Sequence, residues 1–383
     1  MHIPDGYLSP ATCAALYAAS APFWYVSVRR LKRLLANRLI PLLSVFAAFS
    51  FVVMMFNLPL PGGTTGHAVG VGIAAIVLGP WASILAISIA LLIQALFFGD
   101  GGITALGANC FNMAVAGSLV AYASYRLLAG KAAITSRRRV VAAAVAGYCS
   151  INVAALLTAI EFGIQPMWFK DPSGAPLYAP YPLSVAIPAM MIGHLTIAGM
   201  AELILTAGLV AWLARSHPSL LSTTAPKNLL FAQRFSGCGA GRQACNAGGP
   251  AGRTAHSTGL AAALLLGGAG ASACPAEEPA AGWKVLRPLL IGLATLMLVT
   301  PLGILAVGTA WGEWSPSDFP APVLPPGLGR LASIWTAPIP DYAPPFLRSA
   351  SLGYILSALF GAGLILLAAL LLDAIVARRK RVP

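Results

Sequence analysis

The sequence predicts an all-α polytopic membrane protein: a seven-helix domain followed by two further transmembrane helices near the C-terminus. Of its 383 residues, 58% are hydrophobic and only 9% are charged, whereas a soluble domain carries about 25% charged residues. Apolar segments long enough to cross a bilayer recur along the chain. The net charge of +13 comes from Lys and Arg in short runs between these segments, a pattern typical of loops that face anionic lipid rather than of a nucleic-acid-binding surface.

Nine apolar segments are expected to be membrane helices. The run 67–98 is divided by Gly79 and Pro80, which predict the end of a short helix and the start of a full span. The segments lie near 11–28, 39–57, 67–80, 81–98, 104–128, 139–160, 184–214, 285–309 and 350–376.

The distribution of basic residues predicts the orientation of the spans. The connections 29–38 and 126–139 each hold five Lys or Arg, whereas 57–66 and 99–103 hold none. Because basic residues are retained on the cytoplasmic side, we expect the N-terminus outside and the end of the seventh span inside. The same alternation places the segment 310–349 outside and the basic C-terminal tail inside.

The chain is expected to have three parts. Residues 1–215 carry the first seven spans, and residues 283–383 carry the last two. Between them, 216–282 is rich in Gly and Ala and has little periodicity, which predicts a low-complexity cytoplasmic linker.

The first two residues, Met1 and His2, precede any predicted helix. A free α-amine, the amide nitrogen of residue 2 and the imidazole of His2 can bind one metal ion in fused chelate rings, with three nitrogens in a plane. A fourth nitrogen completes the set that Ni²⁺ or Cu²⁺ prefers. Two membrane crossings separate His2 from His67, so both are expected on the outer face, and His67 is the natural fourth ligand.

Other roles for the histidines stay open at this point. A histidine at a helix start more often caps the helix or forms a hydrogen bond than binds a metal. His194 shares one face of the seventh span with Glu202, at a spacing of eight residues. An ionisable side chain within a span suggests a function, and here we expect a helix–helix hydrogen bond or a partner contact rather than direct metal binding.

Four segments carry a resemblance to a known family. "MHIPDGYLSP", "GGTTGHAVG", "GGITALGANCFNMAVAG" and "GHLTIAGMAE" resemble the cobalt and nickel substrate-capture component of energy-coupling-factor transporters, the CbiM/NikM family, over about 1–215. The resemblance implies a metal-capture domain whose ligands are nitrogens of Met1, His2 and His67. It further implies that Asn109 and Asn112, from an Asn-x-x-Asn motif, surround these ligands or pack the helices, and we group His194 with them.

The segments "GTAWGEWSPSDFP" and "LGYILSALFGAGLILL" look like the small NikN/PDGLE-like partner subunit that is fused behind some members. This chain departs from that pattern at 325–331, where "PPGLGRL" stands in place of a sequence closer to "PDGLE". We expect no metal ligand from 283–383.

The resemblance implies a substrate-binding membrane component of an energy-coupling-factor importer, which captures Ni²⁺ or Co²⁺ as cargo at the outer face of a bacterial or archaeal cytoplasmic membrane. No "GxxxxGK[ST]" motif occurs, so ATP hydrolysis is expected from separate ATPase subunits (CbiO/NikO-like) and coupling from a transmembrane protein (EcfT/CbiQ/NikQ-like). No "GxSxG" motif supports an intramembrane hydrolase, and no enzyme activity is expected. The alternative is a stand-alone divalent-metal channel or secondary carrier.

Overall fold

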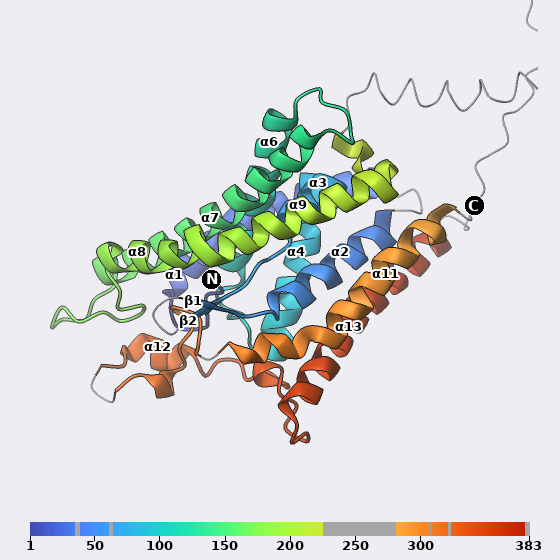
Figure 1. Ribbon diagram of the computed structural model, residues 1–383. Coiled ribbons are helices and arrows are strands. Elements are labelled where there is room, and N and C mark those ends of the chain that lie inside the picture. The colour runs from blue at the N-terminus through green and yellow to red at the C-terminus, as the bar shows by residue number, and fades with distance from the viewer. Residues whose placement is uncertain (35–38, 61–63, 225–280, 307, 321–322, 380–383) are drawn as a thin grey trace, which may run out of the picture.

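The computed structural model describes residues 1–34, 39–60, 64–224, 281–306, 308–320 and 323–379 (Figure 1). Within these ranges the regular structure is helical except for one antiparallel hairpin, in which β1 (Leu58–Leu60) pairs with β2 (Thr64–Gly66). The predicted all-α polytopic class is confirmed. Most of the predicted linker, from 225 to 280, lies outside the described residues.

Each predicted apolar segment contains a helix, and six helical segments in the described ranges are long and apolar enough to cross a membrane. Short π-helical stretches continue α4, precede α6 and join α8 to α9. The helices are α1 (Pro10–Leu34), α2 (Leu39–Met54), α3 (Val71–Leu78), α4 (Pro80–Ile93), α5 (Leu106–Asn109), α6 (Gly117–Ala129), α7 (Arg137–Trp168), α8 (Leu183–Gly193), α9 (Gly199–Ser216), α11 (Ala281–Val299), α12 (Pro326–Leu331) and α13 (Ala350–Arg379).

Helix α3 is shorter than the sequence predicts. It begins at Val71 rather than near 67, because 64–66 pairs with β1 and the chain then turns through Gly70, which has a φ of +74°. All eight residues of α3 are buried. A Cβ on Gly72 would lie 2.5 Å from the Thr206 hydroxyl oxygen, so a glycine is needed for α9 to approach. Helix α3 is therefore a core helix that stops far short of spanning a bilayer.

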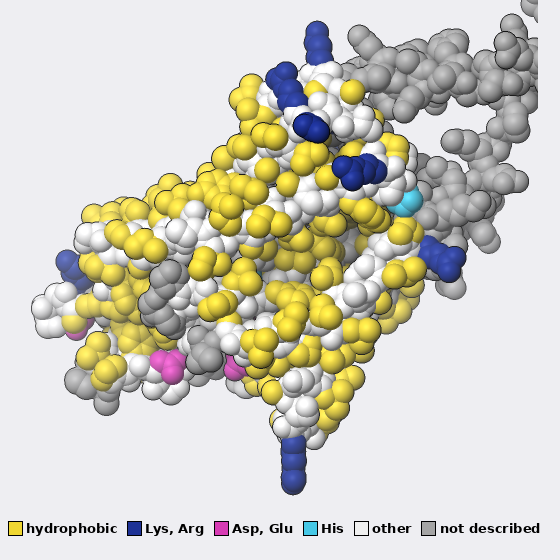
Figure 2. All heavy atoms as spheres, viewed as in Figure 1, with side chains coloured by type: hydrophobic (Ala, Val, Ile, Leu, Met, Phe, Trp, Pro, Cys, Tyr) yellow, Lys and Arg dark blue, Asp and Glu magenta, His cyan; other side chains and the backbone are white. Residues whose placement is uncertain are grey.

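The helices around α3 present apolar side chains to the outside. Leu127 on α6 and Ile204 on α9 are 80% and 63% exposed, and apolar side chains cover most of the face that Figure 2 shows. In a membrane these side chains contact lipid tails. Most Lys and Arg side chains of this face lie at the end where α6 and α9 finish, whereas Asp and Glu lie at the opposite end (Figure 2).

The two C-terminal helices pack on the first domain rather than apart from it. Helices α11 and α13 lie along α2 (Figure 1), and Gly361 of α13 faces the Phe51 ring of α2, where a Cβ in place of its hydrogen would come within 2.2 Å of the ring. The segment between these helices returns to the N-terminal tail: Gly6, with a φ of +90°, leaves room for the Leu328 carbonyl of α12. Residues more than 300 positions apart thus meet at one end of the molecule.

This packing predicts the effect of a single methyl group. Gly361→Ala should destabilise the docking of α13 on α2 by about 1–3 kcal/mol, the usual cost of overpacking a core. Gly363→Ala, two residues along the same helix, meets open space and should be neutral or slightly stabilising, since Ala favours a helix more than Gly does. Thermal unfolding of both variants in detergent measures the difference. Equal stability of the two variants would contradict this packing.

Candidate metal centre

The N-terminal tail is held in place by hydrogen bonds along its length. Asn109 binds the backbone of Ile3 twice: its Oδ1 accepts from the Ile3 amide at 2.8 Å and its Nδ2 donates to the Ile3 carbonyl at 3.1 Å. The Gly102 amide also donates to the Ile3 carbonyl, at 2.8 Å. Because Met1 and Ile3 are 2% and 0% exposed, the first residues form part of the core rather than a frayed end.

A turn follows at Asp5 and Gly6, and it fixes the direction of the tail. The Asp5 carboxylate accepts hydrogen bonds from the Ile103 and Thr104 amides at 3.1 and 2.7 Å. Further on, the Tyr7 hydroxyl donates to the Trp314 carbonyl at 2.9 Å. The tail is thereby clamped between the segment before α5 and the segment between α11 and α13.

The α-amine of Met1 and the amide of His2 point to the same atom. Both donate to Oε1 of Glu313, at 2.7 and 2.8 Å respectively. Two consecutive backbone nitrogens that contact one atom face the same side, which is the conformation that a five-membered chelate ring requires. Glu313 also balances the charge of the buried ammonium group.

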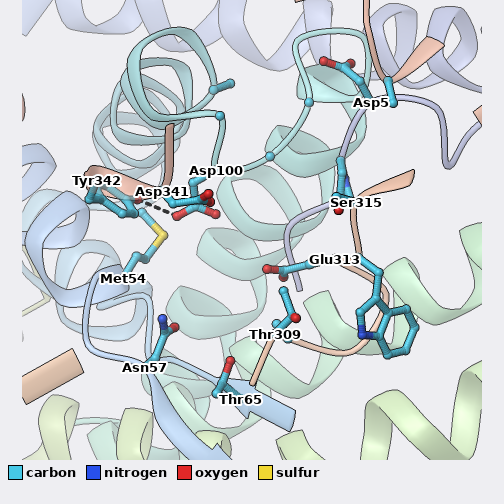
Figure 3. A pocket seen from close by; sticks show the side chains of 18 of the residues that line it. Asp5, Met54, Asn57, Thr65, Asp100, Thr309, Glu313, Ser315, Asp341 and Tyr342 are labelled. Atoms are coloured by element: carbon cyan, nitrogen blue, oxygen red, sulfur yellow. Dashed lines mark hydrogen bonds between the residues drawn. The ribbon is translucent and has the colours of Figure 1, made fainter. Parts of the chain in front are cut away.

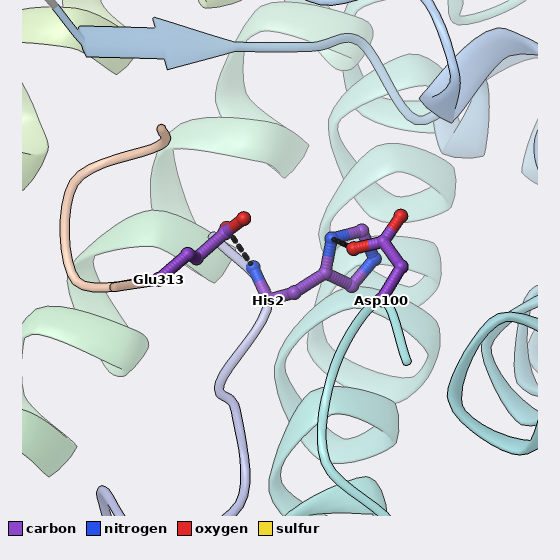
Figure 4. Close-up of side chains that lie close together, drawn as sticks. All are labelled: His2, Asp100 and Glu313. Carbon is purple, nitrogen blue, oxygen red and sulfur yellow. Dashed lines mark hydrogen bonds and ion pairs between the residues drawn. The ribbon is translucent and has the colours of Figure 1, made fainter. Parts of the chain in front are cut away.

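The imidazole of His2 brings two more groups to this point. Its Nδ1 lies 2.9 Å from Oδ1 of Asp100 and 3.3 Å from Nε2 of His67, and the two imidazole rings stack with centroids 4.9 Å apart. Figure 4 shows His2 between the Glu313 and Asp100 carboxylates. The structure therefore brings together the nitrogens of Met1, His2 and His67 that the sequence nominates.

His67 is prepared to act as an acceptor or a ligand. Its Nδ1 contacts the Ala68 carbonyl at 3.0 Å, and since a carbonyl only accepts, Nδ1 carries the hydrogen and the Nε2 lone pair is free. Burial, reinforced by the nearby His2, lowers the pKa of His67 well below its usual value. His67 is therefore neutral at neutral pH, the form that binds a metal.

Asp100 is oriented by residues from both parts of the chain. Its Oδ2 accepts from the Gln94 amide at 3.1 Å and from the Tyr342 hydroxyl, which leaves Oδ1 for His2. Burial acts to raise the pKa of Asp100, but the charge and hydrogen bond of His2 outweigh it and lower the pKa below the usual range. Asp341 and Tyr342 reach this position with left-handed backbone, at φ of +54° and +58°, a strained conformation of the kind found at functional sites.

A cavity of about 410 Å³ adjoins this centre. Four carboxylates line it, and no Lys or Arg is among the described residues of its wall. Figure 3 shows Asp100 and Glu313 on opposite sides with their carboxylates directed into the space. The acidic residues of the wall are Asp5, Asp100, Glu313 and Asp341. The negative charge of the wall attracts cations.

Glu202 holds the loop that carries His67. Its carboxylate accepts hydrogen bonds from the amides of Val69 and Gly70 at 2.8 Å and of Gly72 at 3.1 Å, which are donors at the start of α3. A carboxylate is the favoured partner there because of the helix dipole. Glu202 is fully buried, and its hydrogen bonds join α9 to the start of α3, which is one of the two roles that the sequence suggested for it.

The other two predicted residues form hydrogen bonds with helix residues, although His194 lines a second cavity together with Met1. His194 is buried, and its Nδ1 donates to the Met190 carbonyl of the same helical segment at 2.8 Å, so this bond is not the expected one between helices. Asn112 donates to Thr158 and Glu161 of α7, at 3.1 and 2.8 Å, and packs helices together. Of the predicted surrounding residues, Asn109 contacts the tail directly.

Sequence reasoning missed Asp100 and Glu313. The expectation that 283–383 supplies no ligand candidate also missed Glu313, which contacts both Met1 and His2. A signal was available for Asp100, the single charged residue of the connection 99–103, whereas Glu313 in "WGEW" lies in a segment, 310–349, with four other charged residues and does not stand out.

The sequence is similar to a family of cobalt uptake proteins and to fused nickel transport proteins. The model of the family CbiM, described as the cobalt uptake substrate-specific transmembrane region, matches residues 2–220. The chain is similar to the fused nickel transport protein NikMN of Rhodobacter capsulatus, with 52% identity over 95% of each chain. It is 38% identical to the probable fused nickel transport protein LarMN of Lactiplantibacillus plantarum, over 94% of this chain and 93% of that one.

A solved structure is similar to the N-terminal part. A crystal structure of a truncated transition metal transporter is 49% identical in sequence and superposes with a TM-score of 0.53, over 57% of this chain and all of that one. The two relatives named above, which extend over both parts of the chain, are fused proteins.

The contacts of Glu202 generate a prediction. Glu202→Gln should lower the free energy of unfolding by about 1–3 kcal/mol, because an amide offers one acceptor oxygen to three backbone donors and turns its own N–H groups towards them. Glu161→Gln is the matched control, since the carboxylate of Glu161 is also buried but binds the Asn112 side chain. Thermal unfolding in detergent compares them. A Glu202→Gln variant as stable as Glu161→Gln would show that this carboxylate does not hold the loop.

Proposed function

We propose that this chain, which belongs to the family of cobalt uptake substrate-specific transmembrane regions, is the substrate-capture subunit of an importer for Ni²⁺ or Co²⁺. The chain is a multi-pass membrane protein and a component of metal transport rather than an enzyme. The ion is its cargo. We further propose that the α-amine of Met1, the amide and Nδ1 nitrogens of His2, and Nε2 of His67 bind the ion in one plane.

The observation that carries this proposal is the convergence of these nitrogens. Adjacent ligands on a metal with bonds of about 2.0–2.1 Å lie about 2.9 Å apart in a square plane. His2 Nδ1 and His67 Nε2 are 3.3 Å apart, and the Met1 and His2 backbone nitrogens both face one oxygen atom. Small movements therefore suffice to bring all four to one ion.

The burial of the centre supports selectivity for an ion that accepts nitrogen ligands. Met1, His2 and His67 are 2%, 1% and 3% exposed, so few water molecules can complete the shell of a larger, oxygen-preferring cation. A planar set of nitrogens suits Ni²⁺. Displacement of the His2 amide proton also demands a strongly polarising ion, and Co²⁺ does this less readily.

The packing beneath the site favours capture over a stand-alone channel or carrier. Directly after the His67 loop, all eight residues of α3 are buried and their side chains are apolar or absent. A permeation path requires polar groups along its length, and α3 supplies none. Passage of the ion requires rearrangement, which we assign to a transmembrane coupling protein and separate ATPase subunits of an energy-coupling-factor importer.

The charge distribution supports an orientation. Most of the basic side chains on the face shown in Figure 2 lie at one end of the molecule, and the acidic side chains lie towards the opposite end. Since basic residues favour the cytoplasmic side, we propose that the basic end faces the cytoplasm of a bacterial or archaeal cell and that Met1 and the cavity face outwards from the cytoplasmic membrane.

The chelate predicts a strict need for the native N-terminus. One residue added before Met1 converts the α-amine into an amide and should weaken Ni²⁺ binding by more than about 100-fold, beyond the 10–100-fold loss typical of a supporting contact. The same residue added after Pro383 is the control. Isothermal titration with Ni²⁺ measures both, and undiminished affinity of the N-terminally extended protein would refute the ligand set.

Substitution of a histidine is expected to weaken metal binding only where the histidine lies at the proposed site. His2→Ala and His67→Ala should each lose high-affinity binding, whereas His217→Ala, beyond the end of α9, should retain it. Metal uptake into cells that hold the complete importer provides the measurement, with membrane abundance as the control. Similar losses in all three variants would contradict the proposed site.

The affinity for Ni²⁺ should rise with pH. Binding releases at least the proton of the His2 amide, so each released proton contributes about a tenfold gain in affinity per pH unit. His67 adds little to this dependence near neutral pH, because its lowered pKa leaves it neutral there. Titrations in two buffers of different ionisation enthalpy count the protons, and a count of zero would exclude an amide ligand.

A further inference from the structure

Three side chains beside the four nitrogens form a second group of potential ligands. His2, Asp100 and Glu313 each offer one ligand atom, and these atoms all lie within 4.8 Å of one another. They come from the N-terminal tail, the turn after α4 and the segment between α11 and α13, so the fold and not local sequence brings them together (Figure 4).

The chemistry of this group differs from that of the four nitrogens. Two carboxylates and one imidazole suit any first-row divalent ion, including Mn²⁺, which prefers oxygen ligands. Two ligand atoms on one ion with bonds of about 2.1 Å lie at most about 4.2 Å apart. A separation of up to 4.8 Å therefore needs only a small closure.

The carboxylates and the four nitrogens differ in their exposure to the cavity. The side chains of Asp100 and Glu313 are 18% and 17% exposed and line the acidic cavity, whereas the side chains of Met1 and His2 are 0% and 1% exposed. The carboxylates are therefore the more accessible of the two groups from the cavity.

The hydrogen bonds also make the carboxylates easier for a cation to reach than the backbone nitrogens. The Met1 and His2 backbone nitrogens are both engaged as donors to Glu313, whereas carboxylate oxygens are acceptors that a cation can approach directly. The His2 ring is the group shared by both sets. It is almost fully buried, and its Nε2 has no hydrogen-bond partner among the described residues.

We propose that His2, Asp100 and Glu313 form an acquisition site, which binds a hydrated divalent transition-metal ion before the ion passes to the four nitrogens. This inference rests on the proposed function, because it assumes that the nitrogens are the destination. It gives the C-terminal part of the chain a direct role: Glu313 supplies one ligand and, until the ion arrives, holds the Met1 and His2 nitrogens on the side where the ion will be.

Mn²⁺ tests the acquisition site separately from the nitrogen site, because Mn²⁺ prefers oxygen ligands and binds a deprotonated amide nitrogen poorly. Electron paramagnetic resonance of free Mn²⁺ during titration of the full chain should reveal one site. Glu313→Gln and Asp100→Asn should each weaken it at least tenfold, and Asp171→Asn, a carboxylate in the loop between α7 and α8 and outside the cavity, should not. His67→Ala should retain Mn²⁺ binding while losing high-affinity Ni²⁺ binding.

The kinetics of Ni²⁺ binding test the order of events. Trp311 and Trp314 flank Glu313 in sequence, so quenching of their fluorescence in a stopped-flow experiment should follow arrival of the ion. Association should slow at least fivefold in Glu313→Gln and Asp100→Asn, with a single monodisperse peak in size-exclusion chromatography and native helical content by circular dichroism as the controls for folding. The proposal would be overturned if neither substitution lowered the Mn²⁺ affinity, or if neither slowed Ni²⁺ association.

Full Ni²⁺ affinity in His67→Ala would instead contradict the proposed nitrogen site. The acquisition site would then be tested by the Mn²⁺ affinities alone.

Discussion

The buried α-amine of Met1 is the charge around which the outer end of this molecule is arranged. An ammonium group removed from water costs several kcal/mol unless a partner charge and hydrogen bonds compensate. Glu313 provides that charge at 2.7 Å. The geometry is maintained only because the tail behind the amine is fixed as well, by Asn109 at Ile3 and by the two amides that Asp5 accepts. An N-terminus can serve as a ligand when its conformational freedom has been removed in this way before the ion binds.

This requirement explains why the two parts of the chain are packed into one body. Glu313 has to lie at the first residue, and Tyr342 has to lie at Asp100, yet both come from the segment that joins α11 to α13. The packing of α13 on α2, where Gly361 admits the Phe51 ring, anchors that segment at its far end. The packing of α13 on α2 therefore helps to hold Glu313 and Tyr342 beside the N-terminal tail and Asp100.

The sequence was sufficient for much of the fold and for part of the centre. Hydrophobicity and the Gly79–Pro80 break located the helices, because each is a local property, and the chemistry of positions 1 and 2 is readable without a structure. The late start of α3 was not predictable, because it depends on the pairing of β2 with β1. Glu313 and Asp100 were missed for a related reason. Their roles arise from contacts over 311 and 98 residues with His2, and no periodicity encodes such contacts.

The connection between His67 and Glu202 bears on how a captured ion leaves. Three backbone donors next to His67 depend on one carboxylate of α9, and buried donors left without a partner cost about 1–3 kcal/mol each. Displacement of α9 relative to α3 would therefore release the loop that carries His67 and remove one of the four proposed ligands. Such a movement is expensive unless another source supplies the energy. If the proposed site binds its ion tightly, release accordingly needs an external source of work, and no GxxxxGK[ST] motif occurs in this chain to supply it.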